Sequence, residues 1–186
     1  MDKLDKTISR KLLKAYSSFL KKESGKINVT DLCEKAGVAR ATFYVYYSDM
    51  ASFCKSLNKY IIDKFFKQAT LILSCDESEF SKIVKKENLL FDDDELVILG
   101  NMIKGTKFID FAFLADSYYG DKSNDVLYSK EMWERYKTEI DIFSRGYLHI
   151  LVSGLNNYNE EAFRKDMKYC RLFFNRFYEY MKSECN

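Results

Sequence analysis

Apolar side chains recur every three or four residues along most of the chain, which is the spacing of one face of an α-helix. The first such stretch runs from Leu4 to Lys22, and its apolar face consists of Leu4, Ile8, Leu12, Ala15 and Phe19. Ser24-Gly25-Lys26 follows, and glycine suits the left-handed residue that often ends a helix. The pattern predicts an N-terminal helix over this stretch.

Two short helical stretches come next, one on each side of Gly37. Residues 30–36 can form two turns with Asn28 or Thr30 as the N-terminal cap, and residues 40–46 can form two more. Glycine adopts a left-handed backbone without the steric cost that a Cβ brings. We therefore expect a tight turn at Gly37 between two short helices.

Longer helices are predicted for most of the remaining chain. They cover about Met50 to Leu73 after a cap at Ser48-Asp49, about Ser78 to Lys86, a stretch that begins at the acidic cluster Asp92–Glu95, Lys130 to about Asn156, and a last stretch after Asn159. Carboxylates favour the positive end of a helix dipole. A calcium loop is the alternative for the acidic cluster, but the ligand spacing of an EF-hand is missing. The chain contains no proline and only 7 glycines, which agrees with an all-α fold.

Charge is distributed unevenly along the 186 residues. Residues 1–67 hold 14 Lys and Arg against 7 Asp and Glu, a net charge of +7, whereas the remainder holds 16 against 21, a net charge of −5. A basic segment joined to an acidic one suggests that the basic segment meets a polyanion. Hydrophobic residues make up 47% of the chain, which is enough for a folded core.

Neither the cysteines nor the N-terminus indicates a metal site, a disulfide or a membrane anchor. The five cysteines are Cys33, Cys54, Cys75, Cys170 and Cys185, and no two of them form C-x-x-C. With His149 as the only histidine, a metal site is not expected, and all but Cys185 fit buried free thiols. The N-terminus lacks an apolar signal core, and no apolar run approaches the roughly 20 residues of a membrane span. We expect a cytoplasmic protein without a cofactor.

The segment 29–53, VTDLCEKAGVARATFYVYYSDMASF, carries the most specific signal. Two short helices around a tight turn are typical of a helix-turn-helix, whose second helix lies in the DNA major groove while the first braces it. The side chains expected to form its small core are Leu32, Cys33, Ala36, Val38 and Phe43. Those expected to point outward are Arg40, Thr42, Tyr44 and Tyr46.

This segment resembles the signature of the TetR family of transcriptional regulators. The matching residues are Val29-Thr30, Ala36-Gly37-Val38 and Thr42-Phe43-Tyr44-Val45-Tyr46-Tyr47. The specific resemblance covers roughly 50 residues at the N-terminus, and the rest is similar to the family only in its all-α plan. It implies an N-terminal three-helix DNA-binding head followed by a C-terminal helical body that binds a ligand and dimerises.

The resemblance also implies roles for particular residues of the head. The residues that would lie near base edges are Arg40, Ala41 and Thr42. Arg40 suits guanine because its guanidinium can donate two hydrogen bonds to the two acceptor atoms of that base. Tyr44, Tyr46 and Thr30 would reach phosphates. The alternative for the tyrosines, including Tyr47, is ordinary packing within a helical domain.

Two positions depart from the family pattern. Ala39 stands where the family usually has a serine or threonine that caps the second short helix, and alanine cannot make that bond. Met50 stands where the family often has a lysine that touches a phosphate, and Lys55, one turn further on, is the candidate substitute.

The body is expected to bind a small, often lipophilic effector, again by resemblance. The residues expected to line its cavity are Phe108, Phe111, Tyr118, Trp133 and Tyr136. Ordinary core packing is the alternative. In domain terms, residues 1–50 form the head, a helix to about residue 73 links it to the body, and residues 74–186 form the body.

The last two helices are expected to form the interface of a homodimer. The last helix has a seam of apolar side chains in four-three alternation, and the helix before it offers a second stripe. The residues of this predicted interface are Ile140, Phe143, Tyr147, Ile150, Phe163, Met167, Cys170, Phe174, Phe177 and Met181. The alternative is that both stripes fold inward and the chain is a monomer.

Taken together, the sequence predicts a dimeric, sequence-specific DNA-binding regulator that a small molecule releases from its operator. One alternative is a helical protein-interaction module built on a degenerate helix-turn-helix. Another is a helical enzyme, but the chain has no G-x-G-x-x-G or phosphate loop, and a His-based centre would depend on His149 alone. We expect no enzymatic activity.

Overall fold

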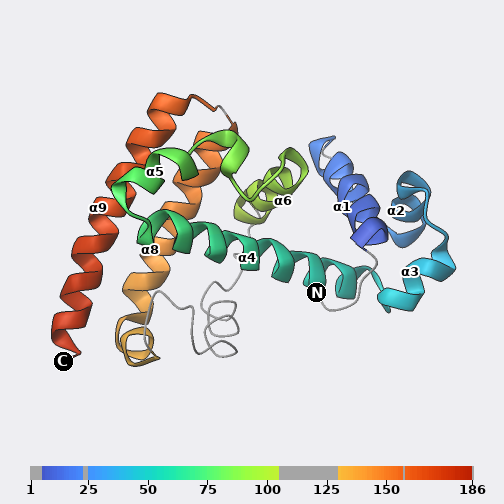
Figure 1. The fold of residues 1–186 in the computed structure, drawn as a ribbon. Helices are drawn as coiled ribbons and strands as arrows, with labels where there is room; N and C mark the ends of the chain where they lie inside the picture. Colours follow the sequence, from blue (N-terminus) through green and yellow to red (C-terminus); the bar gives the residue numbers. More distant parts are fainter. Residues whose placement is uncertain (1–5, 23–24, 105–129, 157, 186) are drawn as a thin grey trace. The chain divides into compact units, whose positions relative to one another are not determined.

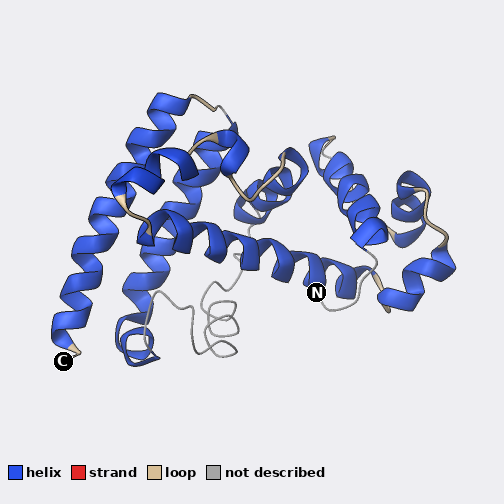
Figure 2. Cartoon of the chain, viewed as in Figure 1, coloured by secondary structure: helices blue, strands red, loops and turns tan. Residues whose placement is uncertain are grey.

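A computed structural model describes residues 6–22, 25–104, 130–156 and 158–185, and all regular structure in these ranges is helical (Figures 1 and 2). The elements are α1 (Lys6–Lys21), α2 (Val29–Ala36), α3 (Arg40–Tyr46), α4 (Met50–Ser74), α5 (Glu77–Ile83), a 3-10 turn at Lys86–Asn88, α6 (Asp93–Lys104), α8 (Lys130–Asn156) and α9 (Glu160–Glu184). In these ranges, no helix combines the length and the apolar character needed to cross a membrane.

Helix α5 is the element whose predicted bounds differ most from the structure. It ends at Ile83, whereas the apolar pattern extended it to Lys86. The chain turns extended at Lys85, and the Asn88 side-chain amide donates to the Lys82 carbonyl at 2.7 Å. That hydrogen bond occupies the Lys82 carbonyl, which would have accepted a backbone N–H from the next turn if the helix had continued. At its other end α5 has a complete capping box between Asp76 and Glu79.

The chain forms two compact units, and α4 contributes residues to both. Unit 1 consists of the described residues up to Ile62 together with Phe91–Lys104, and unit 2 consists of Asp63–Leu90 together with the described residues from Lys130 onward. Helix α6 thus belongs with α1 in unit 1, although the predicted domains placed it in the body. The Lys21 ammonium and the Ser17 hydroxyl, both on α1, each lie 3.0 Å from Oδ1 of Asp94 on α6.

A buried carboxylate forms the centre of unit 1. Glu95 on α6 is 1% exposed, and its Oε1 accepts hydrogen bonds from Arg10 on α1 at 3.3 Å and from Tyr60 on α4 at 2.6 Å. Its Oε2 accepts from the Asp92 N–H at 2.9 Å, which caps α6, and Arg10 also pairs with Asp92. A buried charge is tolerated when it is paired and hydrogen-bonded in this way.

In unit 2, α8 packs against α9. The α9 side chains that this packing buries are Phe163, Met167, Cys170, Phe174 and Met181. The two helices approach closely at Gly154, where an added Cβ would lie 2.6 Å from the Phe163 ring. Helix α8 is interrupted at Tyr136, whose φ of −117° and ψ of 26° are not helical.

Arg171 on α9 holds the start of α5 in place within unit 2. Its guanidinium donates to the Cys75 carbonyl and, at 2.9 Å, to Glu77, and it lies 5.3 Å from the centre of the Phe80 ring. All five cysteines are free thiols. Cys33, Cys75 and Cys170 are buried as expected, whereas Cys54 is only half-buried.

Candidate nucleic-acid interface

The turn between α2 and α3 has the geometry that the sequence predicted. Gly37 has a φ of 61° and a ψ of 40°, in the left-handed region. The N–H of Gly37 donates to the Glu34 carbonyl at 3.1 Å, and the N–H of Val38 donates to the Cys33 carbonyl at 3.0 Å. This pair of bonds is a Schellman motif, which ends α2 and redirects the chain into α3.

The three helix starts in this region are capped differently. Asn28 caps α2, because its Oδ1 accepts from the Asp31 N–H at 2.9 Å. Asp49 precedes α4, and its carboxylate accepts from the Ser52 N–H at 2.7 Å, which lowers the pKa of Asp49. Ala39 precedes α3 and makes no side-chain cap, as expected for alanine. The first turn of α3 therefore leaves its backbone N–H groups without a side-chain acceptor at Ala39.

Aromatic packing fixes the position of α3. Phe43 is fully buried, and its ring lies 5.3 Å from Tyr47 and 6.1 Å from Phe53, measured between ring centres. Tyr47 and Phe53 meet edge to face at 5.1 Å, and Phe53 also meets Tyr16 on α1 edge to face. Tyr47 is thus a packed aromatic. The cluster fixes α3 to α1 and α4 through the side of α3 that carries Phe43.

The remaining core residues behave largely as predicted. Leu32 and Cys33 on α2 are buried, whereas Ala36 and Val38 are half-buried. Burial raises the pKa of the Cys33 thiol, and the nearby Arg40 guanidinium offsets part of that rise. The small core beneath the turn is therefore built from Leu32, Cys33 and Phe43.

The residues predicted to contact DNA lie mostly on the surface of unit 1. Thr30, Arg40, Ala41 and Lys55 are exposed, Thr42 and Tyr46 are half-buried, and Tyr44 is 48% exposed. The structure brings Arg40, Ala41, Thr42, Tyr44 and Tyr46 together on the single helix α3, whereas Thr30 lies on α2 and Lys55 on α4. Val45, for which the sequence predicted no role, is the most exposed large apolar residue of α3, at 77%.

Basic side chains on unit 1 fall into two groups. Arg10 and Lys21 are paired with the acidic start of α6, a contact between segments far apart in the sequence. These two cations are consequently neutralised within the unit. The other exposed basic side chains that the structure describes on the same unit are Lys11, Lys14, Lys22, Lys26, Lys35, Arg40, Lys55 and Lys59.

The predicted effector cavity falls largely outside what the structure describes. Phe108, Phe111 and Tyr118 lie outside the described residues, and the same holds for the side chain of Trp133. Tyr136 is buried, and its ring meets those of Phe177 and Tyr180 edge to face.

The predicted dimer seam points into the chain's own unit 2. Its buried members are Ile140, Tyr147, Phe163, Met167, Cys170, Phe174 and Met181, and its half-buried members are Phe143, Ile150 and Phe177. The chain itself covers the buried side chains, which leaves them little surface for a second chain, and the homodimer interface stays a prediction. The periodic pattern predicts a packing face on α9, but it does not indicate whether helices of the same chain or of a second chain cover that face.

A second apolar stripe of α9 is exposed beside this seam. Its members are spaced by three, one and seven residues, which places them on one helix face: Tyr169, Leu172, Phe173 and Tyr180. Phe173 is 62% exposed and stacks on the half-buried rings of Phe143 and Phe177 at 5.9 and 6.4 Å between ring centres. Ile142 on α8 is also exposed.

Comparison of the chain with models of protein families, with curated proteins and with solved structures finds no match in any of the three.

Proposed function

We propose that the chain is a sequence-specific DNA-binding regulator whose head, formed by α1 to α3 and the start of α4, is a helix-turn-helix of the TetR type. The observation that carries this proposal is the outward face of α3. Arg40 and Tyr44 are exposed there, while Phe43 and Tyr47 hold the helix from behind. A short helix anchored on one side and polar on the other suits insertion into a major groove.

The contacts follow from the side chains on that face. Arg40 is placed to read guanine with its two-pronged guanidinium, and no described residue forms an ion pair with it. DNA phosphates are bound by the hydroxyls of Tyr44 and Thr30 and by the Lys55 ammonium. The exposed lysines of unit 1 add the sequence-independent attraction to DNA.

Two heads are needed for a palindromic operator, with half-sites about 34 to 36 Å apart. We assign the homodimer contact to the exposed stripe Tyr169, Leu172, Phe173 and Tyr180 rather than to the buried seam. Contiguous exposed aromatics are typical of protein interfaces. A small lipophilic effector bound in the body would act by favouring a state with lower operator affinity, so the regulator is a repressor in this scheme.

The second candidate function is a protein-interaction module on the same scaffold. Val45, apolar and 77% exposed on α3, favours it, as does the missing side-chain cap at Ala39. The basic charge of the head favours DNA instead.

Selection from a random pool of duplexes at moderate salt separates the two candidates. If the chain is a DNA regulator, the selected duplexes should share an inverted repeat. The same selection with Arg40→Ala should then lose the sequence preference at one base pair of each half-site. A pool that remains random with the unmodified chain would reject the proposal.

A further inference from the structure

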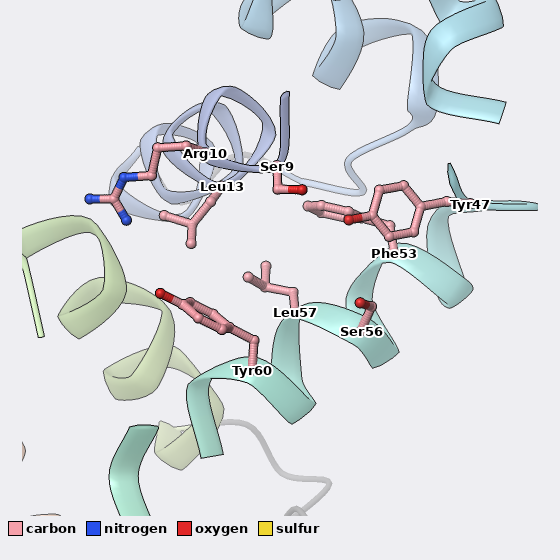
Figure 3. A pocket seen from close by; sticks show the side chains of 8 residues that line it. All are labelled: Ser9, Arg10, Leu13, Tyr47, Phe53, Ser56, Leu57 and Tyr60. Carbon is pink, nitrogen blue, oxygen red and sulfur yellow. The ribbon is translucent and has the colours of Figure 1, made fainter. Parts of the chain in front are cut away.

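Unit 1 contains a cavity of about 420 Å³ between α1 and the first part of α4. Figure 3 shows side chains of α1 facing side chains of α4 across it, with Tyr47 closing one end. A single water needs far less room, whereas pockets for small organic ligands begin at about 300 Å³. The cavity is therefore large enough for a small molecule.

The walls are mainly apolar. Leu13 from α1 and Phe53 and Leu57 from α4 are all buried, and the rings of Tyr47 and Tyr60 add two flat surfaces. Such a lining favours a flat, apolar molecule, because contact with rings removes apolar surface from water on both sides.

One polar group in the wall lacks a partner of good geometry. Ser9 Oγ is buried, and although the Tyr47 hydroxyl lies near it, no described residue meets the distance and angle of a hydrogen bond to it. Tyr47 and Ser56 bring two more hydroxyls into the cavity, as Figure 3 shows. Burial raises the pKa of Tyr47, and the closeness of Ser9 and Ser56 offsets part of the rise. A buried unsatisfied hydroxyl costs free energy that a ligand's hydrogen-bonding group can recover.

The charges at the edge of the cavity select against ionic ligands. Arg10 is the charged residue of the lining, and Asp92 and Glu95 already neutralise it. An anion would have to displace a carboxylate that is 1% exposed, and a cation would leave water for a mainly apolar lining. An uncharged ligand pays neither cost.

From these observations we infer that unit 1 binds an uncharged aromatic molecule of one or two rings, with its hydrogen-bonding group directed at Ser9. Tyr47 is both a wall of the cavity and the residue that ends α3, so the bound molecule touches the element that fixes the position of that helix. Binding here does not require that the chain bind DNA, so this inference and the proposed function fail separately.

The probes are indole, its isostere indene, which lacks the N–H donor, and indoleacetate, which adds a carboxylate. Titration into the full chain is followed by calorimetry and by backbone amide NMR shifts. We expect indole to bind about fivefold more tightly than indene, the ratio that one hydrogen bond supplies, with shifts concentrated in α1 and in the part of α4 from Phe53 to Tyr60. Indoleacetate should bind more weakly than indole.

Two variants locate the site. Ser9→Ala should keep indene binding and reduce the indole preference to within about twofold. Ser56→Leu should fill the cavity and weaken indole binding at least about tenfold, while Ser153→Leu, the same change at an exposed helical serine in unit 2, should not. The inference is overturned if indole shows no saturable binding at millimolar concentration. It is also overturned if Ser56→Leu leaves the affinity unchanged, or if the shifts lie in α8 and α9.

Discussion

The hydroxyl of Tyr60 donates a 2.6 Å hydrogen bond to a carboxylate oxygen of Glu95. The same oxygen accepts from Arg10 at 3.3 Å, so a single buried carboxylate joins α1, α4 and α6. These three helices form the frame of unit 1 to which α2 and α3 are attached. The stability of the candidate DNA-binding head is thus expected to depend on a residue that lies in none of its predicted elements.

Replacing Glu95 by glutamine should lower the free energy of unfolding by about 2 kcal/mol, because a charge-assisted hydrogen bond to Arg10 is lost in a buried setting. Asp92 remains as a partner for Arg10, which limits the loss. Glu87→Gln, at an exposed glutamate on the 3-10 turn, should change little. Urea unfolding measures the free energy of unfolding of both variants. Equal effects of the two substitutions would show that the hydrogen bonds of Glu95 do not stabilise unit 1.

Tyr60 also predicts a dependence of stability on alkaline pH. Burial is the main cause, and the hydrogen bond to Glu95 the next, of a rise in the pKa of Tyr60 above its ordinary value of 10.0. A raised pKa in the folded state means that the stabilising contribution is complete below pH about 10 and is lost as pH rises further. Urea unfolding between pH about 8 and about 11 should show this fall, and Tyr60→Phe should make it shallower. Tyr44→Phe, at an exposed ring, is the matched control; identical slopes in all three proteins would refute the linkage.

Two glycines of α8 should respond to alanine in opposite directions. Gly146 is exposed with open space around it, so Gly146→Ala should stabilise unit 2 by about 1 kcal/mol through helix propensity. At Gly154 an added Cβ would lie 2.6 Å from the buried Phe163 ring, so Gly154→Ala should destabilise it by about 2 kcal/mol. Thermal unfolding compares the pair, and stabilisation by both would mean that α8 and α9 do not approach as described.

Substitutions at two neighbouring phenylalanines of α9 should have different effects, one on dimerisation and the other on folding. Phe173→Glu places a charge on the exposed stripe and should yield a folded monomer, whereas Phe174→Glu buries an unpaired charge and should unfold unit 2, at a cost above about 3 kcal/mol. Leu71→Glu changes an exposed apolar residue of α4 and should remain a dimer. Analytical ultracentrifugation and circular dichroism read out both properties. Unmodified protein that sediments at its 22.0 kDa chain mass would rule out the dimer.

Local signals in the sequence predicted the local structure well. Gly37 marked a left-handed turn because its residue type tolerates that backbone, and Asn28 marked the start of α2 because its side chain can cap a helix. The bounds of α3 and α8 also agree with the apolar pattern.

Long-range relationships could not be read from the same pattern. Arg10 and Glu95 are 85 residues apart, and nothing local to either residue indicates that they pair. Likewise α9 has two apolar stripes, and residue spacing alone cannot tell which one the chain covers itself. The exposure of Phe173 and the burial of Phe174 settle that question only after packing is known.

Arg40 and Tyr44 should contribute to DNA binding in different ways. Arg40→Ala should cost roughly 1 to 3 kcal/mol on the selected operator and relax preference at one base pair per half-site. Tyr44→Phe removes one hydroxyl and should weaken binding to selected and random duplexes alike, as a phosphate contact does. Fluorescence anisotropy on both duplexes measures the two variants. Equal losses on both duplexes for Arg40→Ala would make it a phosphate contact instead of a base contact.

The most direct measurement is the affinity of the unmodified protein for the selected duplex and for a scrambled one across a range of salt concentrations. A helix-turn-helix regulator should prefer the selected duplex by at least about a thousandfold, and the logarithm of its affinity should fall linearly with the logarithm of salt concentration. Equal affinity for both duplexes at every salt concentration, or no binding to either at low salt, would contradict the account.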